Sequence, residues 1–177
     1  HGKSVELIHI QEEENLIPIE AESVDLVHSS GVLHHARNLK AAIAEIRRIL
    51  KPGGKLHVMV YNYDSLWLHL YTAYVHQIEM GLYGDLPIID AFRHTTDGPD
   101  CPISHCYRPP EFLKLIENIG FSSVFKGASI SLTELELLPK RYAAMKDRNL
   151  PREHRDFLYA LQFNQEGHPT INGAVAG

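Results

Sequence analysis

The first 62 residues alternate between strand-like and helix-like patterns of apolar and polar positions. Short apolar runs at 5–10 and 23–30 predict two strands. From Asn38 onward, apolar residues recur every three or four positions as far as Leu50, with charged residues between them, which predicts an amphipathic helix. The Asn38 side chain is suited to cap the start of that helix.

Two features at 52–61 complete a βαβ pattern. Pro52-Gly53-Gly54 should stop the helix, because proline cannot continue it and glycine tolerates a left-handed turn. The almost continuous apolar run at 56–61 predicts a strand buried on both faces. Strand, helix and strand with short connections favour parallel strands, and apolar strands need helices on both sides. The predicted fold class is α/β, with a doubly wound, mostly parallel sheet.

The rest of the chain is predicted to be largely helical. Helices are expected at 65–82, 110–118, 134–146 and 152–161, an ordered loop at 84–107, a strand at 121–132, and the start of a cut-off element at 167–177. We expect one partial domain over 1–177, made of a βαβ core at 1–62, a helical and loop insertion at 63–109, and C-terminal helices with a late strand at 110–177.

Composition narrows the classes of function. The chain has 177 residues, of which 44% are hydrophobic and 22% charged, as in an ordinary soluble domain. Its net charge of −5 argues against a nucleic-acid or anionic-membrane binder, which needs a cationic face. There is no apolar stretch long enough to span a bilayer. The only two cysteines, Cys101 and Cys106, fit a reducing compartment such as the cytoplasm.

Candidate ligand-binding segments follow the first two predicted strands. Ligands of open α/β sheets bind beyond the carboxyl ends of the strands, which here are 11–15 and 28–35. Gly31 permits close approach of backbone to ligand. A carboxylate among residues 12–14 could accept hydrogen bonds from an amino group or a ribose, or these residues could form a solvated turn.

Histidines offer metal and proton chemistry, and no metal site is predicted. His34 and His35 are adjacent and point apart, so that one should pack or cap while the other faces the cleft. Cys101, His105 and Cys106 lack the paired spacing of a zinc site. A further polar group falls in the predicted loop, where substrate contacts and loop-internal hydrogen bonds are both open readings: His94, Asp97, His105 and Tyr107.

Two ordered strings resemble the class I, Rossmann-like, S-adenosylmethionine-dependent methyltransferases, and in particular the type 11-like domains. The first string runs from Ile17-Pro18-Ile19 through Val24-Asp25-Leu26-Val27 to Gly31-Val32-Leu33-His34-His35. The second is the helix and turn from Glu45 to Gly54. The resemblance covers 5–62 closely, and 96–99 and 112–121 less specifically.

The resemblance implies a cofactor, S-adenosyl-L-methionine, and residues that would contact it. Glu12 or Glu13 would lie near the adenine, and Ser29, Ser30 and Gly31 beside the methionine moiety. Leu33 and His34 would line the cofactor pocket or the path to the substrate. The family's first strand, its glycine-rich loop and the acidic residue after its second strand have no counterpart here, so we expect a domain truncated at the N-terminus and also at the C-terminus.

Such a truncation has two expected consequences. Residues 1–177 alone should bind S-adenosylhomocysteine weakly or not at all, because one wall of the pocket would be open. Sheet edges left exposed would favour pairing with a second chain, including a homo-dimer.

The implied reaction is in-line transfer of a methyl group from the sulfonium to a small-molecule acceptor, which depends mainly on proximity and orientation. If the acceptor arrives protonated, the candidate bases are His34, His94 and His105, of which His34 is the first choice. Asp97 and Tyr107 are the candidate substrate contacts. Two rivals stay open: a dinucleotide-dependent oxidoreductase, whose phosphate-binding fingerprint would lie upstream, and a non-catalytic methyltransferase-like module that pairs with a partner.

Overall fold

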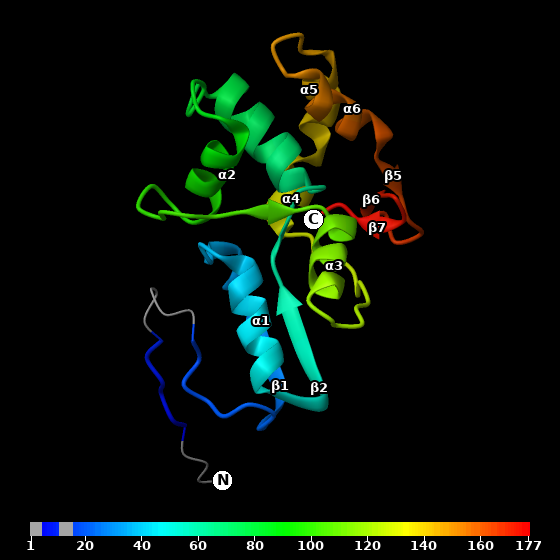
Figure 1. Cartoon of the computed structure of the whole chain (residues 1–177). Coiled ribbons are helices and arrows are strands. Elements are labelled where there is room, and N and C mark those ends of the chain that lie inside the picture. Colours follow the sequence, from blue (N-terminus) through cyan, green and yellow to red (C-terminus); the bar gives the residue numbers. More distant parts are fainter. Residues whose placement is uncertain (1–4, 11–15) are drawn as a thin grey trace. The chain divides into compact units, whose positions relative to one another are not determined.

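The structure is a computed structural model that describes residues 5–10 and 16–177, and the chain divides into two compact units (Figure 1). The first, called unit 1, comprises His1–Val60 and Leu113–Ser123. The second, called unit 2, comprises Tyr61–Phe112 and Val124–Gly177. Each unit has its own packing.

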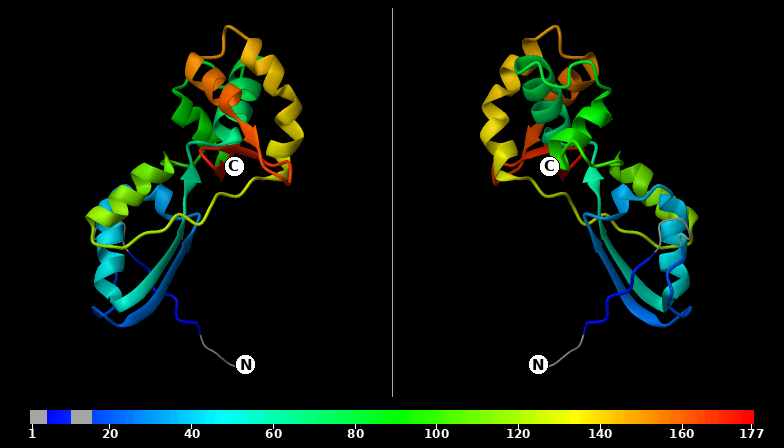
Figure 2. Two further views of the ribbon diagram at one scale, coloured as in Figure 1. Left: turned by 90° about the vertical axis from the view of Figure 1, so that its right-hand side faces the viewer. Right: turned by 90° about the vertical axis from the view of Figure 1, so that its left-hand side faces the viewer.

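Unit 1 is built on a βαβ element. Strand β1 (Val24–Ser30) pairs in parallel with β2 (Leu50–Met59), and helix α1 (Leu39–Ile49) connects them after the short 3-10 turn η1 (Leu33–His35). Helix α1 runs alongside the two strands in Figure 2 and buries four apolar side chains: Leu39, Ile43, Ile46 and Ile49. The predicted order of strand, helix and parallel strand is confirmed.

The ends of α1 show which local signals the fold uses. The Asn38 side-chain oxygen accepts a hydrogen bond from the Ala41 amide at 3.1 Å, which is the predicted cap. The helix, however, ends at Ile49, and 52–54 lies inside β2. The predicted stop was therefore wrong by three residues. Gly53, whose φ is +79°, instead forms a turn at an irregularity in the pairing of β1 with β2. The register of that pairing shifts between Val24 and Leu26.

The strand predicted at 56–61 lies within β2, but the prediction that both of its faces are buried was wrong. Along β2 the side chains alternate between half-buried and exposed, and Met59 and, on β1, Leu26 are each 49% exposed. Among the described residues of unit 1, α1 shields one face of the strand pair while the other stays accessible. The alternation is typical of a strand covered on one side.

The predicted strand at 5–10 is absent. These residues have no regular secondary structure, and all of them are exposed. A strand is held by ladder hydrogen bonds to a neighbour, and these residues join no ladder in the described part of the chain. An apolar run therefore does not specify a strand by itself.

Unit 2 is organised around η2 (Trp67–Glu79), a helix wound in the wider π form. The predicted helix at 65–82 is confirmed as helical. It packs against α5 (Arg141–Lys146) and α6 (Arg152–Ala160). The resulting core gathers buried side chains from these helices and from the C-terminal segment: Leu66, Leu70, Ala73, Tyr74, Val75, Ala144, Leu150, Phe157, Leu158, Leu161 and Ala176.

The predicted loop at 84–107 was wrong in two places. Helix α2 (Ile88–Thr96) forms directly after Pro87 and buries Ala91 and Phe92. Further on, β4 (Cys106–Tyr107) pairs in parallel with β3 (Tyr61–Asn62). The proline, glycine and aspartate residues that suggested a loop flank a helix of only nine residues, too short for its periodicity to stand out.

The later helices agree with the prediction better than the later strands do. Helix α3 (Pro109–Asn118) and helix α6, opened by Pro151, are confirmed. The expected helix at 134–146 is broken into α4 (Leu132–Leu137), the 3-10 turn η3 (Leu138–Lys140) and α5. The predicted strand at 121–132 was wrong, because 121–131 has no strand and exposes Val124 and Phe125.

The C-terminal segment forms regular secondary structure. Strands β5 (Gln162–Phe163), β6 (Pro169–Ile171) and β7 (Ala174–Val175) form a small antiparallel sheet. The Leu66 amide donates to the Ala176 carbonyl at 2.9 Å, and Ala176 is part of the core of unit 2. Within 167–177, β6 and β7 pair with each other, whereas the sequence analysis predicted only the start of an element there.

No helix in the described ranges 5–10 and 16–177 is long and apolar enough to cross a membrane.

Candidate functional site

The carboxyl end of β1 presents small residues and open backbone. Ser29 is buried and Ser30 exposed, and the next residue, Gly31, has a φ of +70°. The Gly31 amide donates to the Met59 carbonyl at 3.2 Å, which fixes the turn to the end of β2. Among the described residues, a Cβ at Gly31 would meet only the Met59 methyl group, 3.9 Å away. A ligand can therefore approach the backbone closely at this point.

The 3-10 turn η1 carries the next two candidates. Leu33 is buried and His34 is fully buried, whereas His35 is half-buried. The two imidazole rings meet edge-on with centroids 4.2 Å apart, so the prediction that they point apart was wrong: it applies to a regular helix or strand, whereas these residues lie in a 3-10 turn. The Ala36 amide donates to the Leu33 carbonyl at 3.1 Å and closes the turn. Ser29, Ser30, Gly31, Leu33 and His34 thus occupy one short segment of unit 1, while Glu12 and Glu13 lie outside the described residues.

The candidates of unit 2 gather around the end of α2. Asp97 follows the helix, and its carboxylate accepts hydrogen bonds from the Tyr61 hydroxyl at 2.8 Å and from the Thr96 hydroxyl at 3.0 Å. Burial, followed by the bond to Asp97, raises the pKa of Tyr61 to about 12. Tyr61 stands opposite Cys106 in the β3–β4 pair. Asp97 is therefore joined to the short sheet that also carries Tyr107.

His94 lies on α2, and its ring stacks against Tyr83, whose backbone has a positive φ. Tyr83 has a φ of +58°, and its ring stacks on the His94 imidazole at 5.1 Å, with the two planes 11° apart. The Gln77 amide group holds this loop by donating to the Tyr83 carbonyl at 2.9 Å and to the Leu86 carbonyl at 3.0 Å. The buried Nδ1 of His94 has no hydrogen-bond partner among the described residues.

His105 and Tyr107 differ in their surroundings. His105 is exposed and touches Tyr107 with ring centroids 6.2 Å apart. Tyr107 packs on Phe112 at 5.2 Å, and burial raises the pKa of its hydroxyl. Both open readings of the loop residues find some support, because Asp97 makes internal hydrogen bonds whereas His105 faces outward.

A buried histidine pair in unit 2 escaped the sequence analysis. The Nδ1 atoms of His69 and His154 lie 2.8 Å apart, and His69 stacks on Phe157 at 3.9 Å. Burial, followed by the neighbouring His154, lowers the pKa of His69 to about 2, and burial also lowers that of His154. The partners are 85 residues apart in the sequence, and no local spacing signals such a contact.

An ion-pair network lies next to this pair and was also missed. Arg108 pairs with Asp64 and, at 3.0 Å, with Glu153, and its guanidinium stacks 4.1 Å from the Tyr63 ring. The Tyr63 hydroxyl donates to Glu153 at 2.9 Å, and the Tyr63 ring meets that of His69. Burial, followed by the bond to Glu153, raises the pKa of Tyr63 to about 12.

Comparison with known proteins finds a family model that matches the βαβ element. Residues 2–58 match the family model described as a methyltransferase domain. A stretch of 58 residues is 41% identical to the ubiquinone/menaquinone biosynthesis C-methyltransferase of Cupriavidus taiwanensis, covering 33% of this chain and 23% of that protein. Another of 82 residues is 34% identical to an uncharacterized 37.1 kDa transposon protein of Streptomyces fradiae, covering 46% and 20%. The chain thus spans about a fifth of these relatives.

Among solved structures, the chain is similar to an S-adenosylmethionine-dependent methyltransferase of Thermotoga maritima, with 18% identity and a TM-score of 0.42 over 62% of this chain and 43% of that one. The sequence match and the parallel βαβ element agree with each other. The match of residues 2–58 to a methyltransferase domain agrees with the predicted resemblance to the class I methyltransferases, whose cofactor is S-adenosylmethionine.

Proposed function

We propose that the protein carrying this chain transfers a methyl group from S-adenosylmethionine to a small-molecule acceptor. The observation that carries this proposal is the open backbone at Gly31, which lies at the carboxyl end of β1 within the segment that matches the methyltransferase domain. Open α/β sheets bind their ligands at this end of their strands.

The residues present fit part of such a cofactor. The exposed Ser30 hydroxyl can donate to or accept from a polar group of the ligand. Gly31 leaves the space that a side chain would fill, and Leu33 adds an apolar wall that excludes water. The bound cofactor would supply the transferable methyl group on its sulfonium. The work of this segment is to hold and orient it, which is where such a reaction gains most of its rate.

His34 is the proposed base for an acceptor that arrives protonated. Its position, three residues after Gly31, supports this role, and its complete burial supports a packing role equally well. A His34→Gln change separates the two. A base predicts a fall in kcat of about 100-fold with an unchanged unfolding midpoint. A packing residue predicts a lower midpoint with kcat retained in the folded fraction, which would contradict the assignment.

The acceptor is proposed to be small because the net charge of −5 offers no cationic face to a nucleic acid. Asp97 and Tyr107 are the proposed substrate contacts, and His94 and His105 the alternative bases. An Asp97→Asn change should then raise KM more than it lowers kcat. Two properties also remain proposals: a cytoplasmic location, supported by the low cysteine content, and pairing of two copies, supported by the open face of β1 and β2.

Equilibrium binding to the protein that carries this chain tests the proposal. S-adenosylhomocysteine should bind with micromolar affinity, whereas NADH should not bind at the same concentrations. Preferential NADH binding would support a dinucleotide-dependent oxidoreductase instead. Binding of neither ligand would leave the non-catalytic module as the better account, and either result would overturn the proposal.

A further inference from the structure

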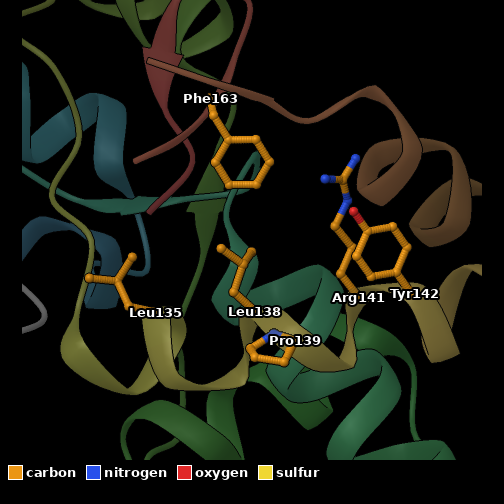
Figure 3. A pocket seen from close by; sticks show the side chains of 6 residues that line it. All are labelled: Leu135, Leu138, Pro139, Arg141, Tyr142 and Phe163. Carbon is orange, nitrogen blue, oxygen red and sulfur yellow. The ribbon is translucent and has the colours of Figure 1, made fainter. Parts of the chain in front are cut away.

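We propose that unit 2 contains a second ligand site, a cavity that binds a small apolar molecule carrying one carboxylate. The cavity measures about 310 Å³ and lies at the junction of α4, η3, α5 and β5. Figure 3 shows the side chains that line it, which are Leu135, Leu138, Pro139, Arg141, Tyr142 and Phe163. This site is separate from the methyltransferase segment and does not depend on the proposed function.

The walls of the cavity are apolar and expose two aromatic rings. Phe163 is 49% and Tyr142 is 64% exposed, although Tyr142 comes from α5, which also supplies Ala144 to the core of unit 2. In Figure 3 the Phe163 ring and the Leu138 side chain face the same space, and Arg141 stands beside Tyr142. Small-molecule sites typically combine such apolar walls with few polar groups, and their volumes start at about 300 Å³. The ligand should accordingly be small.

Arg141 is the one charged group in the lining, and the protein fixes it firmly. Its Nε donates to the Leu158 carbonyl at 2.6 Å, and its Nη2 donates to the carbonyls of Tyr159 and Leu161 at 3.2 Å. These carbonyls stand at the C-terminal end of α6, where a cation interacts favourably with the helix dipole. The guanidinium is thereby held in place before any ligand arrives.

These hydrogen bonds leave the charge of Arg141 uncompensated. The residue is only 9% exposed, yet no carboxylate pairs with it within residues 5–10 and 16–177. Its Nη1 group takes no part in the three bonds to carbonyls. A buried charge without a counter-ion is costly. Carboxylates and phosphates are the anions whose geometry fits a guanidinium.

The aromatic rings favour a carboxylate on an apolar body over a bare anion. The guanidinium carbon lies 5.8 Å from the centroid of the Tyr142 ring and 5.7 Å from that of Phe163. A ligand whose carboxylate reached Nη1 would therefore place its apolar part against Phe163 and Leu138. A single cation suits one carboxylate, whereas a phosphate group typically meets several donors.

Octanoate and 1-octanol form a matched pair of probes, because they share an alkyl chain and differ in charge. In a titration followed by ¹H–¹⁵N correlation spectra of the whole chain, octanoate should shift the amides of 135–138, 140–142 and 162–163. It should bind at least about tenfold more tightly than 1-octanol, as one charge-assisted hydrogen bond to Arg141 would give. Equal binding of the two probes, shifts confined to other residues, or no shift at millimolar octanoate would each overturn the proposal.

Two variants locate the site. Phe163→Ala removes a wall of the cavity and should weaken octanoate binding about fivefold or more, whereas Tyr159→Ala removes an exposed ring of α6 that does not line the cavity and should leave it unchanged. Equal effects of both variants would contradict the assignment. Neither variant replaces Arg141, so its three hydrogen bonds to the carbonyls at the end of α6 are kept in both.

Discussion

The two units of this chain differ in their similarity to known proteins and in how completely their apolar side chains are buried. Unit 1 holds the segment that matches a known family, yet its strand pair leaves Leu26 and Met59 half exposed. Unit 2 lies beyond the matched residues 2–58, yet it contains the better packed interior, in which Leu66 and Leu70 are completely buried. Similarity to a family and completeness of packing are therefore separate properties of the molecule.

This difference shows that the two units depend on different kinds of interaction. In unit 1 the match follows positions that set the backbone, such as the cap at Asn38 and the turn at Gly31. In unit 2 the structure depends on long-range side-chain contacts, such as His69 with His154. Truncation of apolar side chains in the core of unit 2 should therefore cost more than truncation in the strands of unit 1, whereas loss of a helix cap should cost about the same in both units.

The largest expected effect is a core truncation in unit 2. Leu70→Ala should lower the local free energy of unfolding by about 2–5 kcal/mol, because it leaves a cavity at a fully buried site. Leu26→Ala in unit 1 should cost less than about 1 kcal/mol, because half of that side chain already contacts water. Site-resolved hydrogen exchange measures both. Equal costs would contradict the contrast between the units.

The next effect is a dependence on pH that unit 2 alone should show through its histidine pair. The pKa of His69 is lowered to about 2 and that of His154 is also lowered, so the unfolded chain binds more protons than the folded chain once the pH falls below about 6.5. The histidines therefore do not reduce the free energy of unfolding above pH 6.5. Below that pH the free energy of unfolding falls, by at most about 1.4 kcal/mol per pH unit for each histidine.

A His69→Gln change sharpens this prediction. It removes one of the three histidines of unit 2 whose pKa is lowered by burial, which are His69, His76 and His154, so the loss of stability between pH 6 and pH 4 should become less steep, whatever the variant costs at pH 7. Urea unfolding followed by Trp67, the single tryptophan of the chain and a residue of unit 2, provides the measurement. An unchanged slope would show that the pair does not control the acid sensitivity.

The smallest effect is that of the helix caps, which should not distinguish the units. Asn38→Ala removes the bond to the Ala41 amide in unit 1, and Ser131→Ala removes the bond to the Glu134 amide that starts α4 in unit 2. Each should cost about 1 kcal/mol. A cost several times larger in one unit would show that its helix is held by little besides the cap.

The sequence predicts those parts of the structure that local chemistry determines. Asn38, Pro109 and Pro151 mark helices correctly, and the alternation of strand and helix predicts the parallel pairing of β1 with β2. It fails at 5–10 and 121–132, because a strand needs a partner that an apolar run does not provide.

The candidate site divides in the same way. The segment from Ser29 to His34 could be proposed from the sequence because its residues are consecutive and follow a strand. The buried pair of His69 and His154, and the network around Arg108, join residues far apart in the chain. Only the fold brings them together.

The most direct test of the central claim, that a methyltransferase cofactor binds at the carboxyl end of β1, is a matched pair of glycine substitutions in the protein that carries this chain. Gly31 and Gly53 have φ values of +70° and +79°, so Gly31→Ala and Gly53→Ala impose similar backbone strain in the same unit, but only Gly31 lies at that end. The account predicts that Gly31→Ala weakens S-adenosylhomocysteine binding by about tenfold while Gly53→Ala leaves it unchanged. Equal affinity in the two variants would contradict it.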